Sequence, residues 1–144
     1  MSRDIKFRAW RGENMHFDVV IYMGEGWIED HSLSADAIYI KSGVDILMQF
    51  TGLTDKNGVD IYDGDIVSFL GEYKNEPNRQ VLFDVDFLTY TILSKQEKEW
   101  VDGGSNHYKY CRQEGNTDLY FLNDLDSYEL EVIGNIYENK DLLQ

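Results

Sequence analysis

The chain has 144 residues, of which 42% are hydrophobic and 14% aromatic, and this is enough apolar material to bury the core of one domain. Its net charge is −14, from 27 acidic and 13 basic residues, and such a charge repels phosphate backbones, so direct binding of nucleic acid is not expected. The sequence shows no long apolar run and no signal-peptide pattern, and its single cysteine, Cys111, cannot form a disulfide within the chain, so we expect a soluble protein of the cytoplasm with no membrane association.

The N-terminal third predicts short antiparallel strands. The residues Ile5, Phe7 and Ala9 alternate with Lys6, Arg8 and Trp10. This alternation predicts a half-buried strand whose cations point away from the core. Further strands are predicted at 17–22, 27–28, 38–40 and 46–50.

Basic residues are concentrated at the start of the chain. The first eleven residues sum to +3, since Arg3, Lys6, Arg8 and Arg11 face only one acid, and the remaining chain sums to −17. Two explanations stay open: these cations pair with acidic surface on the same fold or on a neighbouring copy, or they contact an external anion. Because Trp10 shares their face, we predict a contact surface made of Arg3, Lys6, Arg8 and Trp10.

The segment 47–67 contains two turn signals, Asn57-Gly58 and Asp63-Gly64, each flanked by β-branched or aromatic residues. Asn57-Gly58 predicts a type I′ hairpin turn, in which both residues take a positive φ. After the second turn, residues 66–70 are apolar on both faces, which predicts a central strand. The turn residues of this segment are Asn57, Gly58, Asp63, Gly64 and Asp65.

The rest of the chain continues the β pattern. Strands are predicted at 81–87, 89–93 and 128–137, the last interrupted by Gly134. The charged, glycine- and tyrosine-containing stretch 94–115 predicts a long exposed hairpin with its tip near 103–105, and 117–128 predicts a short helix. Short strands joined by tight turns are typical of a small closed barrel, so the predicted fold is mainly β.

Four aspartates, Asp55, Asp60, Asp63 and Asp65, lie within eleven residues and could hold a hard cation. Their spacing does not match a calcium loop, and the interpretation we favour assigns them to turns, to capping of backbone groups and to solvent. The pair His107 and Cys111 is too sparse for a zinc site. The sequence therefore predicts no catalytic residue, no metal and no cofactor.

Three segments, 6–10 (Lys-Phe-Arg-Ala-Trp), 47–67 and 132–139 (Val-Ile-Gly-Asn-Ile-Tyr-Glu-Asn), resemble the YopX family of phage and prophage proteins in the same order. This resemblance implies a partly open, SH3-like barrel of antiparallel strands with a hairpin or loop insertion and at most one or two short helices. It also implies a single domain over 1–144, in which the strands of 1–45 could form a sub-layer on a barrel core of 46–144. The family brings no established activity with it.

Surplus aromatic residues and the lack of a catalytic constellation indicate a non-enzymatic accessory protein that binds a host or phage protein in the bacterial cytoplasm, with self-association as a second form of binding. The first alternative is an acidic mimic of nucleic acid that occupies the DNA-binding groove of a host protein. The second alternative is a small metal-dependent enzyme that uses the aspartate cluster.

Overall fold

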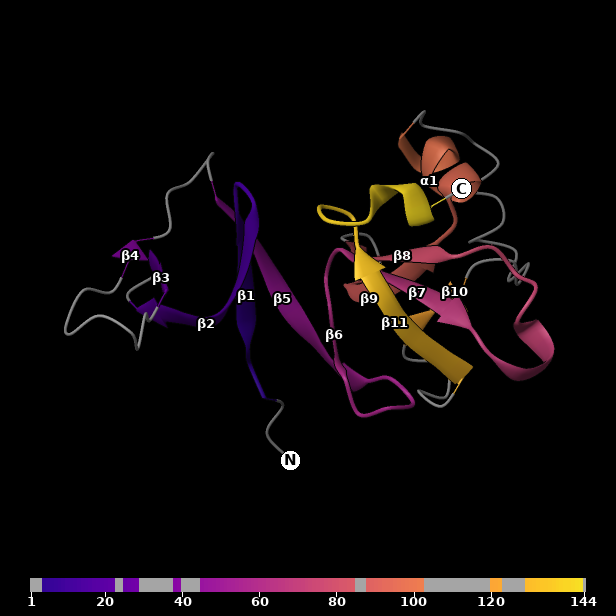
Figure 1. Cartoon of the computed structure of the whole chain (residues 1–144), viewed down its shortest axis with the longest axis horizontal. Coiled ribbons are helices and arrows are strands. Elements are labelled where there is room, and N and C mark those ends of the chain that lie inside the picture. The colour runs from indigo at the N-terminus through magenta and orange to yellow at the C-terminus, as the bar shows by residue number, and fades with distance from the viewer. Residues whose placement is uncertain are drawn as a thin grey trace. The chain divides into compact units, whose positions relative to one another are not determined.

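The computed structural model describes residues 4–22, 25–28, 38–39, 45–84, 88–102, 120–122 and 129–143. The chain divides into two compact units, Met1–Gly52 and Leu53–Gln144 (Figure 1). Strand β5 runs from the first unit into the second. The organisation as one domain stays a prediction.

The first unit is an antiparallel sheet in which β1 lies between β2 and β5. Gly12, with a φ of 62°, makes the tight turn from β1 to β2, a conformation that glycine adopts at low cost. Trp10 is opposite Met15 on β2 and opposite Ile46 on β5, so these three side chains share one face. The strands are β1 (Phe7–Arg11), β2 (Asn14–Tyr22), β3 (Glu25–Ile28), β4 (Ile38–Tyr39) and β5 (Asp45–Thr54), and the order in the sheet is β4-β3-β2-β1-β5-β6.

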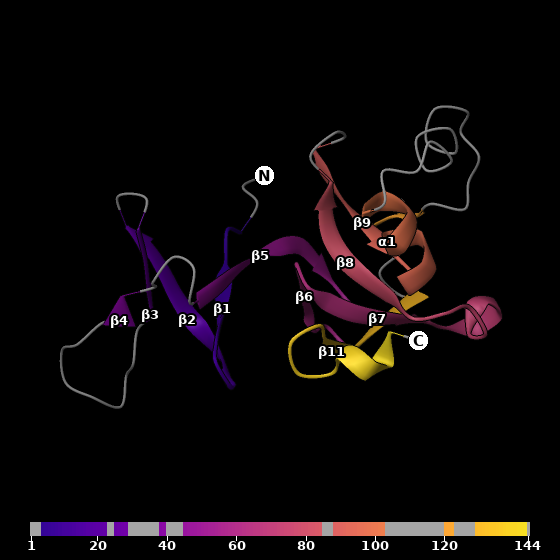
Figure 2. The same ribbon diagram turned by 90° about the horizontal axis from the view of Figure 1, so that it is seen from above.

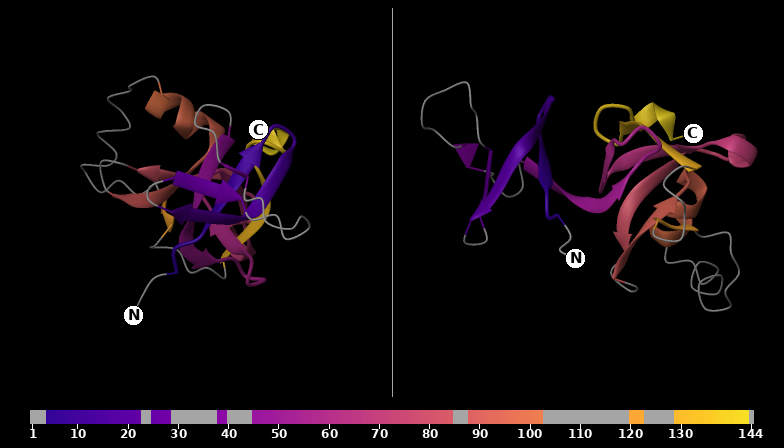
Figure 3. Two further views of the ribbon diagram at one scale, coloured as in Figure 1. Left: turned by 90° about the vertical axis from the view of Figure 1, so that its left-hand side faces the viewer. Right: turned by 90° about the horizontal axis from the view of Figure 1, so that it is seen from below.

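The second unit contains a five-stranded antiparallel sheet with the order β10-β9-β8-β7-β11. This sheet curls into a half-barrel, as Figures 2 and 3 show. The helices of the second unit are η1 (Gly71–Tyr73), α1 (Lys95–Asp102) and η4 (Lys140–Leu142). The strands of its sheet are β7 (Asp65–Phe69), β8 (Arg79–Asp84), β9 (Thr89–Leu93), β10 (Tyr120–Phe121) and β11 (Leu130–Asn135). Strand β6 (Asp60–Tyr62) also belongs to this unit but pairs with β5 in the other sheet.

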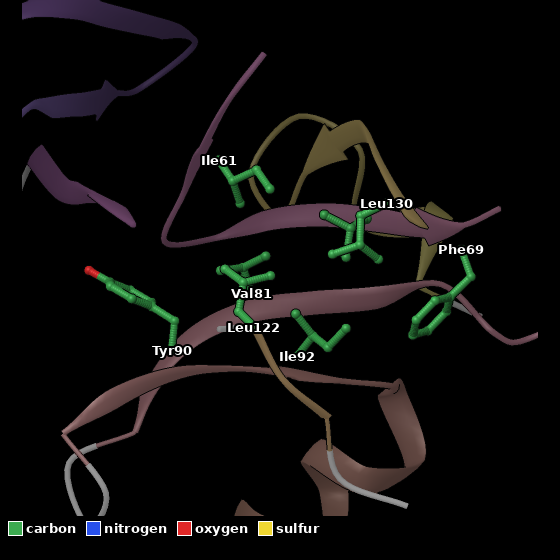
Figure 4. Packing of buried hydrophobic residues seen from close by; sticks show 8 residues of the cluster. Ile61, Phe69, Val81, Tyr90, Ile92, Leu122 and Leu130 are labelled. Carbon is green, nitrogen blue, oxygen red and sulfur yellow. The ribbon is translucent and has the colours of Figure 1, made fainter. Parts of the chain in front are cut away.

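The concave side of the half-barrel holds the main apolar core (Figure 4). Strand β7 lies between β8 and β11, and Ile66 and Val67, which point to opposite faces, are both fully buried, so the predicted central strand is confirmed. The core cluster consists of Ile61, Val67, Phe69, Val81, Tyr90, Ile92, Leu122 and Leu130. By contrast, the cluster described in the first unit contains only Ala9 packed against Val19.

The mainly β fold with antiparallel strands and a partly open barrel is confirmed, while two local predictions are wrong. The exposed hairpin predicted over 94–115 begins instead as helix α1, and the helix predicted over 117–128 contains strand β10 at Tyr120–Phe121. The remaining residues of both segments lie outside the described part of the chain. No helix in the described ranges is long and apolar enough to span a bilayer.

Candidate functional site

The first turn of the 47–67 segment closes the hairpin between β5 and β6. The Gly58 N–H donates to the Asp55 carbonyl (3.0 Å), and the Asp55 N–H donates to the Val59 carbonyl (2.8 Å). Gly58 has a φ of 79°, whereas Asn57 does not have a positive φ. The predicted type I′ turn is therefore wrong: the loop has three residues, with glycine alone in the left-handed region, because the extra residue Lys56 lengthens the connection.

The Asp55 side chain ties this hairpin to β11. Oδ1 accepts the N–H groups of Asn57 (2.8 Å) and Val59 (3.0 Å), and Oδ2 accepts the Val132 N–H (3.0 Å). Burial of Asp55, which is 4% exposed, raises the pKa of its carboxyl, but these three hydrogen bonds and the charge of Lys56 outweigh burial and hold that pKa below its ordinary value. The Asp55 carboxylate thus satisfies two backbone N–H donors of the turn and one of the edge strand β11.

The second turn, Asp63-Gly64, connects β6 to β7 and so joins the two sheets. Gly64 has a φ of 84°; its N–H donates to the Val81 carbonyl, and its carbonyl accepts the Ile136 N–H, both at 2.9 Å. Asp65, which is 1% exposed, accepts the Tyr62 N–H at 2.7 Å. The two turns therefore hold neighbouring strands of the half-barrel together through hydrogen bonds to backbone groups.

The 132–139 segment forms a matching anchor at the end of β11. Asn135 Oδ1 accepts the N–H groups of Tyr137 and Glu138, both at 3.0 Å, so its side chain closes the turn after the strand. Gly134 lies against Asn139: a Cβ atom at position 134 would be 2.5 Å from Asn139 Oδ1. Only glycine fits there without a shift of its neighbour.

These contacts bear on the aspartate cluster. The carboxylates of Asp55 and Asp65 are already engaged by backbone N–H donors. Among the described residues, no group of three or more His, Cys, Asp or Glu side chains is arranged to hold a metal ion. His107 and Cys111 lie outside the described residues.

The polar contacts that hold α1 were not predicted from the sequence. The Glu97 N–H donates to Ser94 Oγ (3.3 Å), and the Ser94 N–H donates to Glu97 Oε2 (2.6 Å), which is a reciprocal capping box. The same Glu97 carboxylate forms a buried ion pair with Arg79 of β8, whose guanidinium lies 5.5 Å from the Phe69 ring centroid. The Ser-x-x-Glu spacing at 94–97 was the signal that could have predicted this helix.

Of the predicted contact surface, Arg8 and Trp10 lie on β1 and Lys6 directly precedes this strand, and the structure differs from the prediction at Arg8. Arg8 is 5% exposed, and its Nη2 is 3.6 Å from Sδ of Met48, the residue directly opposite on β5. The alternation predicted that Arg8 points to solvent, but β1 is an interior strand, so side chains of the neighbouring strand cover the face that carries Arg8. Lys6 is exposed and its Nζ lies 4.8 Å from the Phe50 ring centroid. Arg3 lies outside the described residues.

The far end of the same face is more accessible. Trp10 and Met15 are half-buried, and Ile46 is 39% exposed. We call these three cross-strand neighbours the Trp10 row. Next to it on the sheet, Arg11 forms a bidentate ion pair with Asp45; this hydrogen bonding raises the pKa of the Arg11 guanidinium and fixes the register of β1 against β5.

The described contacts define a mainly β protein in which polar side chains of both turn segments hold the backbone together. The chain belongs to the YopX family, whose model, "YopX protein", matches residues 6–144. Two solved structures share the fold: protein EF1440 from Enterococcus faecalis, 20% identical over 99% of this chain and 100% of that chain with a TM-score of 0.55, and protein yopX from Bacillus subtilis, 18% identical over 96% and 98% with a TM-score of 0.60. Among curated proteins, none matches the chain.

Proposed function

We propose that this protein is a non-enzymatic binding module that contacts another protein through the Trp10 row. One observation carries the proposal: Met15, Trp10 and Ile46 form a continuous apolar row across three strands, and the row remains partly accessible. Large apolar side chains that stay exposed side by side mark interaction surfaces.

The composition of the row fits a protein contact. Tryptophan and methionine are enriched in interfaces, and tryptophan is frequently a residue whose truncation costs most of the binding free energy. The Arg11–Asp45 ion pair, one residue further along each strand, points to the opposite face of the sheet and holds β1 and β5 together beneath the row. The partner that we propose is a host or phage protein or a second copy of this chain, in the cytoplasm of a bacterial host.

A binding role also agrees with how the acidic residues are used. Asp55 and Asp65, two of the four aspartates of the predicted cluster, are buried and accept backbone N–H groups. Glu97, outside that cluster, is also buried and is engaged by Ser94 and Arg79. Such carboxylates stabilise the fold and are not available to a substrate. The metal-dependent enzyme therefore has less support than the binding module.

The acidic mimic of nucleic acid is the remaining alternative. The second unit has eight basic and nineteen acidic residues, but burial removes part of that charge from the surface, as at Asp65, Asp84 and Glu97. A mimic requires its carboxylates outward at the spacing of phosphates. No specific arrangement of the described acids favours this alternative.

Adjacent residues of β5 provide a matched test. Ile46 (39% exposed) and Leu47 (40% exposed) are equally accessible but point to opposite faces of the sheet, Ile46 toward the Trp10 row. Ile46→Glu should abolish self-association measured by light scattering, or the capture of a partner from host lysate, whereas Leu47→Glu should preserve it. Both variants must keep the wild-type circular dichroism spectrum. Equal loss of binding in both variants, or in neither, would contradict the proposal.

A further inference from the structure

The second unit has a groove that the fold-holding contacts do not explain. A hollow of about 810 Å³ is lined by residues of α1 and of the C-terminal segment that follows β11. Two smaller hollows, of about 440 and 400 Å³, adjoin it: the first shares Lys95 and Glu99 with the large hollow, and the second shares Asp141. We call the three together the α1 groove. The large hollow is by itself big enough for a ligand, since known ligand pockets have volumes of roughly 300–1,000 Å³.

Both walls of the α1 groove are held by specific contacts. On one side, the capping box of Ser94 and Glu97 fixes the start of α1, and the buried Arg79–Glu97 ion pair attaches the helix to β8. On the other side, Asn78 Nδ2 donates to the Leu142 carbonyl at 2.9 Å and holds η4. A groove whose walls are already in place loses little conformational entropy when a partner binds.

The lining combines apolar surface with charge. Ile136, Tyr137 and Leu143 supply the apolar part from the C-terminal segment. Lys98 and Asp102, one turn apart on α1, form an ion pair with each other. The salt bridges within the described part of the chain do not include the other charged lining residues, which are Lys95, Glu99, Lys140 and Asp141.

The charge of the whole unit decides between a basic and an acidic ligand. With eight basic and nineteen acidic residues, the second unit attracts cations over distances longer than a contact. Within the groove, exposed lysines and carboxylates lie on both sides, Lys95 and Glu99 on α1 and Lys140 and Asp141 on the C-terminal wall. The lining is therefore balanced in charge, and the negative charge of the surrounding unit favours the basic ligand. We propose that the α1 groove binds an extended segment of another protein that alternates apolar and basic side chains.

The size of the groove sets the length of this segment. Helix α1 has eight residues and is therefore about 12 Å long. An extended chain advances about 3.3 Å per residue, so roughly four residues lie along the helix. Their apolar side chains pack on Ile136 and Leu143, and their basic side chains pair with Glu99 and Asp141.

The site is tested with fluorescently labelled eight-residue peptides added to the full chain. A peptide of alternating leucine and lysine should bind about tenfold more tightly than one of alternating leucine and glutamate or of alternating serine and lysine. Amide chemical shifts should change on α1 and on 136–143. Tighter binding of the glutamate peptide would overturn the proposal, because the groove lysines would then select the ligand.

Charge-matched variants separate the groove from the general field of the protein. Glu99→Lys with Asp141→Lys should weaken the leucine–lysine peptide about tenfold, and Glu13→Lys with Glu72→Lys, which makes the same change in net charge at exposed sites outside the groove, should weaken it far less. Equal weakening by both pairs would refute a specific site. Ile46→Glu should leave peptide binding unchanged, so a failure of the α1 groove proposal can be distinguished from a failure of the Trp10 row proposal.

Discussion

Replacing Asp55 tests whether the 47–67 segment stabilises the fold. Its carboxylate accepts three backbone N–H groups, from Asn57, Val59 and Val132. Hydrogen bonds to a charged acceptor contribute about 1.5–3 kcal/mol each, but water can replace the carboxylate at the exposed turn residues Asn57 and Val59. We therefore expect Asp55→Ala to lower the free energy of unfolding by about 3–5 kcal/mol, a large part of the total stability of a domain of this size.

The pH dependence gives this prediction a second, independent readout. The pKa of Asp55 is lower in the folded chain than its ordinary value, so ionised Asp55 stabilises the fold above about pH 4, and this stabilisation is lost as the pH falls through the folded-state pKa. Asp55→Asn has no titrating group, and its amide cannot accept all three N–H groups. The stability difference between wild type and Asp55→Asn should therefore narrow below about pH 4.

Urea denaturation followed by circular dichroism at pH 7, 4 and 3 measures both effects. Glu72→Gln is the control, since Glu72 is an exposed acid on η1. The reasoning is refuted if Asp55→Ala costs less than about 1 kcal/mol. It is also refuted if the difference between wild type and Asp55→Asn stays constant with pH.

Four further predictions follow from the other anchors. Gly58→Val should cost about 1–3 kcal/mol in a thermal melt, because valine resists a φ of 79° even though the space around it is open. Gly134→Ala should destabilise the fold through its contact with Asn139, and Asn139→Gly should be less harmful in that background than in the wild type, as a double-mutant cycle in urea would show. Glu97→Gln should lower the melting temperature, because Arg79 then keeps only the partly exposed Glu76 as a counter-charge, a loss of about 1.5–3 kcal/mol. Added Mg²⁺, Ca²⁺ or chelator should leave the melting temperature unchanged, because the described acids form no metal site. An ion that did bind would raise the melting temperature by mass action.

Local sequence signals predicted most strands but not which face each would bury. The alternation around Arg8 correctly predicted β1, yet alternation carries no information on whether a strand is interior or at an edge of its sheet. Arg8 is buried because β1 has neighbours on both sides. At 94–102 the dense charge suggested an exposed hairpin, although the capping pair Ser94 and Glu97 was present in the sequence.

Composition also overstated the acidic surface. Asp55, Asp65 and Glu97 each count toward the net charge of −14, but each is buried and engaged in the fold. Nothing in their spacing shows this, because their partners, such as Val132 for Asp55, are distant in sequence. Only long-range contacts distinguish an acid that stabilises the fold from one that faces solvent.

The segments through which the chain resembles its family include those that hold the half-barrel together. Asp55 and Gly64 of the 47–67 segment contact Val132 and Ile136 of the 132–139 segment, so the two motifs form one backbone network around β11. Membership of the family therefore explains the scaffold and does not by itself locate a binding site. The Trp10 row, of which only Trp10 lies in a family motif, and the α1 groove, built mainly from α1 and the C-terminal segment, are where variants should alter binding and spare stability. Variants of Asp55 or Gly134 should lower stability and spare binding, and this opposite response would separate residues that hold the fold from the two proposed binding sites.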